Sequence, residues 1–177
     1  KNTKEIKYKN TVKGITENLI LIEKVIGNAS SIKDEKQRKR IINLYNGYKY
    51  ILTHRVIDEN HLKELYSILS DGLLEKCDLI RMGNLYREDK VYILKNGRLD
   101  VEPDQGLPYD LISDYMNIYF DYVNDDNMIG KSETDYFIKS QIMHFYFVYI
   151  HPYFDVNGRT SRTMAMWYLL KNDIYPY

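Results

Sequence analysis

His-Pro-Tyr-Phe-Asp-Val-Asn-Gly-Arg-Thr-Ser-Arg, residues 151–162, is the stretch of this sequence that decides the fold. Pro152 lacks an N–H group and cannot continue a helix without losing a hydrogen bond, so the chain must turn here. Apolar residues at helical spacing precede the turn from Thr134 and follow it through Leu170. The segment between Ile142 and Ile150 is apolar almost all round, which favours a central, buried helix. The sequence therefore predicts a polar loop between two largely apolar helices.

The rest of the chain predicts further helices with the same periodicity. They cover residues 11–26, the charged run after Ser31 that leads to Tyr48, residues 61–74 and residues 109–123. Ser31 is a candidate N-cap for the second of these helices, with acidic residues in its first turn. We therefore expect a mainly α fold, a single-domain helical bundle.

A short β-hairpin is expected between these helices. Residues 91–94 form a strand-like run, and Asn96-Gly97 is a strong two-residue hairpin signal, with residues 98–101 as the returning strand. A hairpin of this size is marginal alone and must pack against the helices. It is either a plain connection or a mobile flap beside a site.

Composition and charge exclude several classes of protein. Lys plus Arg and Asp plus Glu number 25 each, so the overall charge favours neither nucleic acid nor a membrane surface. No basic stripe with interleaved aromatic residues appears. No apolar run reaches the length of a transmembrane helix, and the N-terminus does not have the form of a signal peptide. The single cysteine, Cys77, favours a reducing compartment.

The start of the helix after the loop has the chemistry of an anion site. Its N–H groups carry partial positive charge, and Gly158 lets a phosphate approach the backbone closely. Arg159 and Arg162 are three residues apart and project from one face, where two guanidinium groups can clamp a polyphosphate. Asn157 can donate an amide hydrogen bond to a phosphate oxygen. Each residue also has a plain structural interpretation as a helix cap or a surface ion pair.

Asp155 would repel phosphates unless a cation lies between them, and Mg²⁺ bridging a carboxylate and substrate phosphates resolves this conflict. His151 begins the loop, and an imidazole titrates near neutrality, so it can accept a proton from an attacking hydroxyl. The loop therefore predicts a phosphate-binding site with a general base.

These residues resemble the Fic motif, His-x-Phe-x-Asp/Glu-Gly-Asn-Gly-Arg-x-x-Arg. The upstream segment Gly83-Asn84-Leu85-Tyr86-Arg87, followed by residues 91–93, is similar to the segment that leads into the family's flap. The resemblance implies a Fic catalytic core over residues 61–177, with N-terminal helices in residues 1–60 packed on it.

The resemblance also implies an enzyme, a Mg²⁺-dependent protein adenylyltransferase that transfers AMP from ATP to a Ser, Thr or Tyr hydroxyl of a target protein or of itself. His151 would activate the hydroxyl and Asp155 would hold Mg²⁺ on the phosphates. The phosphate-binding residues it implies are Asn157, Gly158, Arg159 and Arg162. The flap residues Val91, Tyr92 and Ile93 would hold the target segment by strand pairing.

Two positions depart from the motif. Tyr153 replaces the usual Phe, an aromatic exchange that keeps an anchor for the loop. Val156 replaces the first Gly, and a β-branched residue is costly there if the position needs a positive φ. The transferred group therefore stays open between AMP and another phosphate-containing group, such as UMP, phosphate or phosphocholine. A nucleotide-binding module without turnover is the remaining alternative.

Lys13-Gly14-Ile15-Thr16-Glu17-Asn18 resembles the inhibitory helix of many Fic proteins, Ser/Thr-x-x-x-Glu-Gly/Asn, with Lys13 as a departure. The resemblance implies a class II protein, in which Glu17 pairs with Arg162 and blocks productive placement of the γ-phosphate. An ordinary exposed helical glutamate is the alternative. The family is mainly bacterial, so we expect a cytoplasmic bacterial protein that uses ATP and a target protein as partners, with a homo-oligomer left open.

Overall fold

The computed structural model of this protein describes residues 27, 34–81, 85–93, 104–125, 127 and 132–174. The fold is mainly helical, as the sequence predicted. The α-helices are α2 (Glu35–Thr53), α3 (Glu59–Ser70), α4 (Lys76–Arg81), α5 (Ile112–Asn124), α6 (Glu133–Ile150) and α7 (Asn157–Lys171). A 3₁₀ turn, η3 (Tyr109–Leu111), leads into α5, and two short strands pair as β1 (Tyr92–Ile93) and β2 (Asp104–Gln105).

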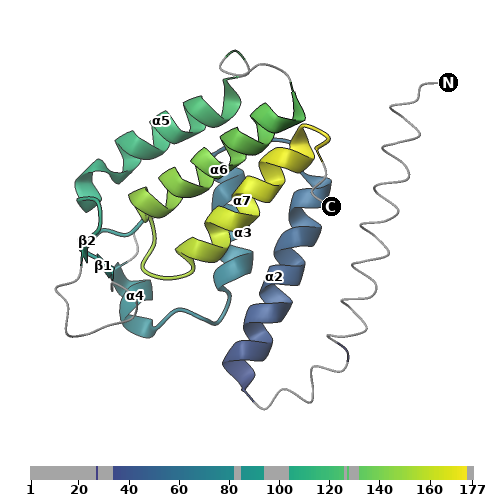
Figure 1. Ribbon diagram of the computed structural model, residues 1–177. Coiled ribbons are helices and arrows are strands. Elements are labelled where there is room, and N and C mark those ends of the chain that lie inside the picture. Colours follow the sequence, from purple (N-terminus) through teal and green to yellow (C-terminus); the bar gives the residue numbers. More distant parts are fainter. Residues whose placement is uncertain are drawn as a thin grey trace.

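Helix α7 occupies the middle of the bundle (Figure 1). It packs along α6 on one side and contacts α2 and α3 on others, while α5 lies on the far side of α6. Trp167 is completely buried in α7, and its Nε1 donates a hydrogen bond of 2.6 Å to the His54 carbonyl just after α2. The polar loop is the short link between α6 and α7, so it starts and ends on the two helices that share this core.

Side-chain caps mark the starts of α2, α3 and α6. The Asp34 carboxylate accepts from the N–H of Gln37 at 3.1 Å, so Asp34 caps α2 and the predicted cap Ser31 was placed too early. The shift follows from geometry, because an N-cap reaches only the N–H groups two or three residues ahead. Helix α6 begins with a reciprocal capping box between Ser132 and Asp135.

The prediction of a central, buried helix is wrong for one side of α6, which is exposed. Met143, Phe147 and Ile150 are buried, but Phe145 on the same helix is 65% exposed and Tyr149 is 52% exposed. Helix α6 contacts α7 on one side and α5 on another, which leaves its third side without a packed neighbour among the described residues. Apolar composition does not report burial by itself, because more than half of a protein surface is apolar.

The hairpin exists with a register different from the predicted one. Tyr92 pairs with Gln105 and Ile93 with Asp104, so the returning strand is β2 rather than residues 98–101. The pairing leaves residues 94–103 between the strands, a connection longer than a two-residue turn at Asn96-Gly97. Residues 94–103 lie outside the described part of the chain.

The N-terminal region is described from Asp34 onward, and the predicted helix over residues 11–26 lies outside the described residues. Helix α2 packs against α3 and α7, so this region belongs to the same core as the rest of the bundle. The helices of the described residues include none with the length and apolar character needed to cross a bilayer.

Candidate active site

The loop between α6 and α7 turns the chain at two residues with left-handed backbone. His151 has φ 51° and ψ 59° at the end of α6, and Val156 has φ 68° and ψ 2° at the start of α7. Neither residue is glycine, so each conformation costs about 1–2 kcal/mol relative to the right-handed region. Such residues persist only where the surrounding structure holds them, and they concentrate at functional sites.

Tyr153 and Asn157 hold the loop in shape. The Tyr153 ring is completely buried and stacks on Tyr66, with ring centroids 3.5 Å apart. The buried Asn157 amide binds the Tyr153 backbone twice: its Oδ1 accepts from the Tyr153 N–H at 3.0 Å and its Nδ2 donates to the Tyr153 carbonyl at 2.7 Å. The loop is therefore a pre-formed turn anchored in the aromatic core.

His151 is placed to act as a base. Its Nδ1 lies 3.2 Å from the Val148 carbonyl, which can only accept, so this contact puts the ring proton on Nδ1 and leaves a lone pair on Nε2. Burial lowers the pKa of His151, and the nearby Arg87 cation lowers it further, while the Val148 hydrogen bond and Asp155 oppose the shift. The imidazole therefore stays neutral and able to take a proton at neutral pH.

The first turn of α7 presents positive charge. Arg159 has its Nη1 atom buried without a hydrogen-bond partner among the described residues. Burial is the main cause that lowers the pKa of Arg159, and the neighbouring Arg40 and Arg162 add to this effect, whereas Asp155 opposes it. A Cβ at Gly158 would lie 3.4 Å from Nη1 of Arg162, so the glycine leaves room beside that guanidinium. A buried donor without a partner next to like charges is suited to bind an anion.

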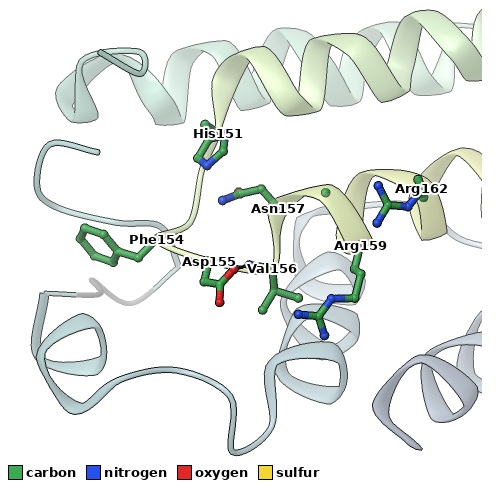
Figure 2. A pocket seen from close by; sticks show the side chains of 8 residues that line it. His151, Phe154, Asp155, Val156, Asn157, Arg159 and Arg162 are labelled. Atoms are coloured by element: carbon green, nitrogen blue, oxygen red, sulfur yellow. Dashed lines mark hydrogen bonds between the residues drawn. The ribbon is translucent and has the colours of Figure 1, made fainter. Parts of the chain in front are cut away.

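These groups share one cavity of about 260 Å³ (Figure 2). Its lining residues are His151, Phe154, Asp155, Val156, Asn157, Gly158, Arg159 and Arg162. The cavity therefore brings together the predicted base, the predicted metal ligand and all four predicted phosphate-binding residues. Its volume lies just below the usual range of about 300–1,000 Å³ for pockets of whole small molecules, so it is sized for phosphate groups rather than for a complete nucleotide.

Two of the predicted roles can be compared with local contacts. The Asn157 side-chain amide is hydrogen-bonded to the Tyr153 backbone. Its second amide hydrogen and its backbone N–H at the start of α7 are the groups left to contact a phosphate. Asp155 is exposed, and its Oδ1 accepts from the Val156 N–H at 2.6 Å. One carboxylate oxygen remains for Mg²⁺, which proteins often hold through one or two carboxylates together with substrate phosphates.

A metal ion bound without substrate would need more protein ligands than the single Asp155 carboxylate. Within the described part of the chain, no group of three His, Cys, Asp or Glu side chains is arranged to hold one. The donor set therefore fits a cation that arrives with its phosphates.

The other predicted site residues are three residues of the hairpin and Glu17. Tyr92 is 61% exposed on β1, and the Val91 carbonyl accepts from the Gly106 N–H at 3.0 Å. Val91 and Tyr92 are not among the described residues that line the cavity, and the Ile93 side chain lies outside the described part of the chain. Glu17 lies outside the described residues, so its pairing with Arg162 stays a prediction.

The sequence model of the Fic/DOC family matches residues 56–169. The chain belongs to the Fic/DOC family. A search of curated proteins gave no match.

The Fic fold is also found in solved structures. A Fic family protein from Desulfovibrio desulfuricans G20 is similar with a TM-score of 0.61 and 22% identity, over 77% of this chain and 37% of that one. Fic-1 from C. elegans is similar with a TM-score of 0.54 and 19% identity, over 81% of this chain and 41% of that one. The chain thus spans about two fifths of the length of these relatives, and identities this low speak for the fold alone.

Within this Fic domain, two residues outside the motif contact the loop and were not predicted as site residues. Tyr66 of α3 stacks under Tyr153 and directs its hydroxyl at the Asp155 carbonyl at 3.4 Å. Arg87 donates to the carbonyl of His151 at 2.8 Å from far upstream in the chain. Arg87 follows Tyr86 in the segment that resembles the family's approach to the flap, and this was the only signal the sequence carried.

Proposed function

We propose that this Fic domain is a protein adenylyltransferase that moves AMP from ATP to a hydroxyl of a protein. Fic domain proteins typically transfer nucleotide or phosphate-containing groups to proteins. The observation that supports the proposal most is that His151 shares a phosphate-sized cavity with Arg159 and Arg162. A base and an anion clamp in one cavity are what transfer of a phosphoryl-linked group requires.

In this reaction the target hydroxyl oxygen attacks the α-phosphorus of ATP. Its proton passes to Nε2 of His151, a new bond forms between that oxygen and the α-phosphorus, and the bond from the α-phosphorus to the oxygen bridging to the β-phosphate breaks. Pyrophosphate leaves with the negative charge that this oxygen gains. Arg159, Arg162 and the N–H groups of the first turn of α7 would bind the leaving phosphates and stabilise that charge.

Asp155 is the residue that would hold Mg²⁺ with the substrate phosphates, and the ion would neutralise part of their charge. The exposed strand β1 would hold the target segment by main-chain pairing, with Tyr92 beside the modified side chain. Strand pairing reads the backbone rather than the side chains, so it suits a range of target sequences.

Regulation by Glu17 is part of the same proposal. Nη1 of Arg159 has no hydrogen-bond partner within the described part of the chain, and with the neighbouring Arg162 it could bind an acidic side chain in the phosphate site. A glutamate bound there would compete with the γ-phosphate through charge-assisted hydrogen bonds. Its removal by Glu17→Gly should then raise activity, and an unchanged rate would contradict this part of the proposal.

The proposal is tested by label transfer. The chain is incubated with Mg²⁺ and ATP labelled on the α-phosphate, and self-modification is followed by intact mass. We expect a gain of one AMP in the wild type and none in His151→Ala. His144→Ala is the matched control, since His144 lies on the same helix but does not line the cavity, and it should retain transfer.

Other donors separate the alternatives. If only the γ-phosphate of ATP labels the protein, the transferred group is phosphate. If only UTP or only CDP-choline labels it, the transferred group is UMP or phosphocholine, respectively. A higher melting temperature with ATP but no product from any donor would indicate a binding module.

A further inference from the structure

Arg87 is a buried cation whose side-chain hydrogen bonds to described residues all go to main-chain carbonyls. Its side chain is almost completely inaccessible, with the residue 1% exposed. Nε donates to the His151 carbonyl at 2.8 Å, Nη1 to the Asp89 carbonyl at 2.6 Å and Nη2 to the Leu107 carbonyl at 2.6 Å. Its backbone N–H donates to the Pro152 carbonyl at 3.0 Å. One residue therefore contacts four separate points of the backbone.

Two of these contacts fall on consecutive carbonyls of the active-site loop. His151 has left-handed backbone, and the orientation of its carbonyl defines its ψ angle of 59°. Because Arg87 binds the carbonyls of both His151 and Pro152, it fixes the two peptide planes that follow the His151 Cα atom. The direction in which the imidazole leaves the backbone depends on these planes.

The other two contacts fall on the two ends of the hairpin. Asp89 precedes β1 and Leu107 follows β2, so the guanidinium joins the segments that enter and leave the paired strands. The packing here is close: a Cβ on Gly106 would meet Cγ1 of Val91 at 2.6 Å and Nη2 of Arg87 at 3.4 Å. The base of the hairpin and the loop are thus held to one planar group.

We propose that Arg87 is a positioning residue that sets the distance and angle between the hairpin and His151. Where the hairpin carries a target segment, Arg87 then places the target hydroxyl relative to the base, and this consequence rests on the proposed function. An arginine suits the role because its planar fork presents donors in fixed directions, whereas a lysine ammonium is a compact point charge on a flexible stem.

Arg87→Lys and Lys139→Met form a matched pair of variants. Lys139, on the first half of α6, is also a buried cation and is 2% exposed. It donates to the Asp125 carbonyl at 2.8 Å, just after α5. Both substitutions should lower the melting temperature, because each disturbs a buried charge and its hydrogen bonds. Only Arg87→Lys should affect the loop.

The rate of self-labelling is measured at saturating ATP below both melting temperatures, together with the ATP concentration that gives half of the maximal rate. We expect Arg87→Lys to reduce the maximal rate about 10²-fold, the loss typical of a misplacement near 1 Å. The half-saturating ATP concentration should be unchanged, because Arg159 and Arg162 are intact. Lys139→Met should keep the wild-type rate. An Arg87→Lys rate equal to that of the wild type, or an equal loss in both variants, would overturn the proposal.

NMR of the His151 ring separates this proposal from the proposed function, since it needs no turnover. The ring resonances should move in Arg87→Lys and stay in place in Lys139→Met. If the wild type transfers no group at all, the shift still supports the positioning role. If the wild type transfers AMP and the His151 resonances are the same in Arg87→Lys, the positioning role of Arg87 is wrong and the proposed adenylyltransferase function is retained.

Discussion

Val156 makes two opposing contributions to the stability of the fold, backbone strain and side-chain burial. Its left-handed backbone costs a β-branched residue about 1–2 kcal/mol. Its side chain is 4% exposed within the main core cluster, and burying a valine is worth about 1.5–3 kcal/mol. Glycine would remove the strain but also the buried methyl groups, and it would add about 0.5–1 kcal/mol of backbone entropy. The packing contribution is the larger one, which explains how valine persists where the motif has glycine.

Val156→Gly is therefore expected to lower the free energy of unfolding by about 1–2 kcal/mol, because the lost packing and the added backbone entropy together exceed the released strain. Urea unfolding measures the change. The control is Val123→Gly on α5, which is fully buried in ordinary helical backbone and should cost about 1–2 kcal/mol more, since no strain is released there. Equal costs at the two sites would show that the strain at Val156 is absent.

Tyr153 carries a hydroxyl that its surroundings do not use. The residue is completely buried, and its hydroxyl oxygen has no hydrogen-bond partner among the described residues. Leaving such a group unsatisfied costs about 1–3 kcal/mol, so Tyr153→Phe should raise the free energy of unfolding by about 1 kcal/mol. Chemical denaturation tests this against Tyr66→Phe, which removes a hydroxyl bonded to the Asp155 carbonyl and should not stabilise the protein.

His151 determines the acid side of the pH dependence. Burial, its main influence, lowers the pKa of His151 in the folded protein below the ordinary value of about 6.5. The group thus binds protons more weakly when folded, so its contribution to stability is complete above about pH 6.5 and is lost as pH falls through the folded-state pKa. The acid limb of the rate against pH should also lie below about 6.5. A limb centred above that value in the profile of kcat/KM would contradict the neutral, buried base.

At the scale of the elements, the helices and the loop were predictable because their causes are local, although the cap of α2 was placed at Ser31 instead of Asp34. Asp58 reaches the N–H of His61 three residues ahead, and the positions of Pro152 and Gly158 limit the turn to a few residues. The hairpin register and the exposed side of α6 could not be predicted, because both depend on partners that are distant in sequence. Arg87 belongs to the same class, because its contacts to residue 107 and the loop appear only after folding.

The capping box at the start of α6 tests one of these local causes. The Ser132 hydroxyl accepts from the Asp135 N–H at 3.2 Å, and the Asp135 carboxylate accepts from the Ser132 N–H at 3.1 Å. Ser132→Ala should lower the free energy of unfolding by about 1 kcal/mol, as N-cap losses usually do. Thr134→Ala, an exposed neighbour within the first turn, should leave it unchanged, and thermal unfolding of both variants decides between them.

At the scale of the whole molecule, residues that follow α2 hold the end of α7. Arg55 Nη1 donates to the Leu170 carbonyl at 2.6 Å and forms an ion pair with Asp173 at 3.2 Å, a favourable place for a cation at a helix C-terminus. The His54 carbonyl accepts from Trp167 Nε1 alongside. Residues 34–60 therefore share one core with the helices that follow them.

Because α2 and α7 share one core, we expect the described helices to unfold in a single cooperative transition. Trp167 is the single tryptophan of the chain, so its fluorescence reports the contact between α2 and α7, while far-UV circular dichroism reports all helices. The two signals should coincide during urea unfolding, as in a two-state protein. Arg55→Met should shift both midpoints together, with a loss of about 1 kcal/mol because the side chain is partly exposed. A fluorescence change that precedes the loss of helix would mean that α2 detaches first and that the N-terminal region is a separate unit.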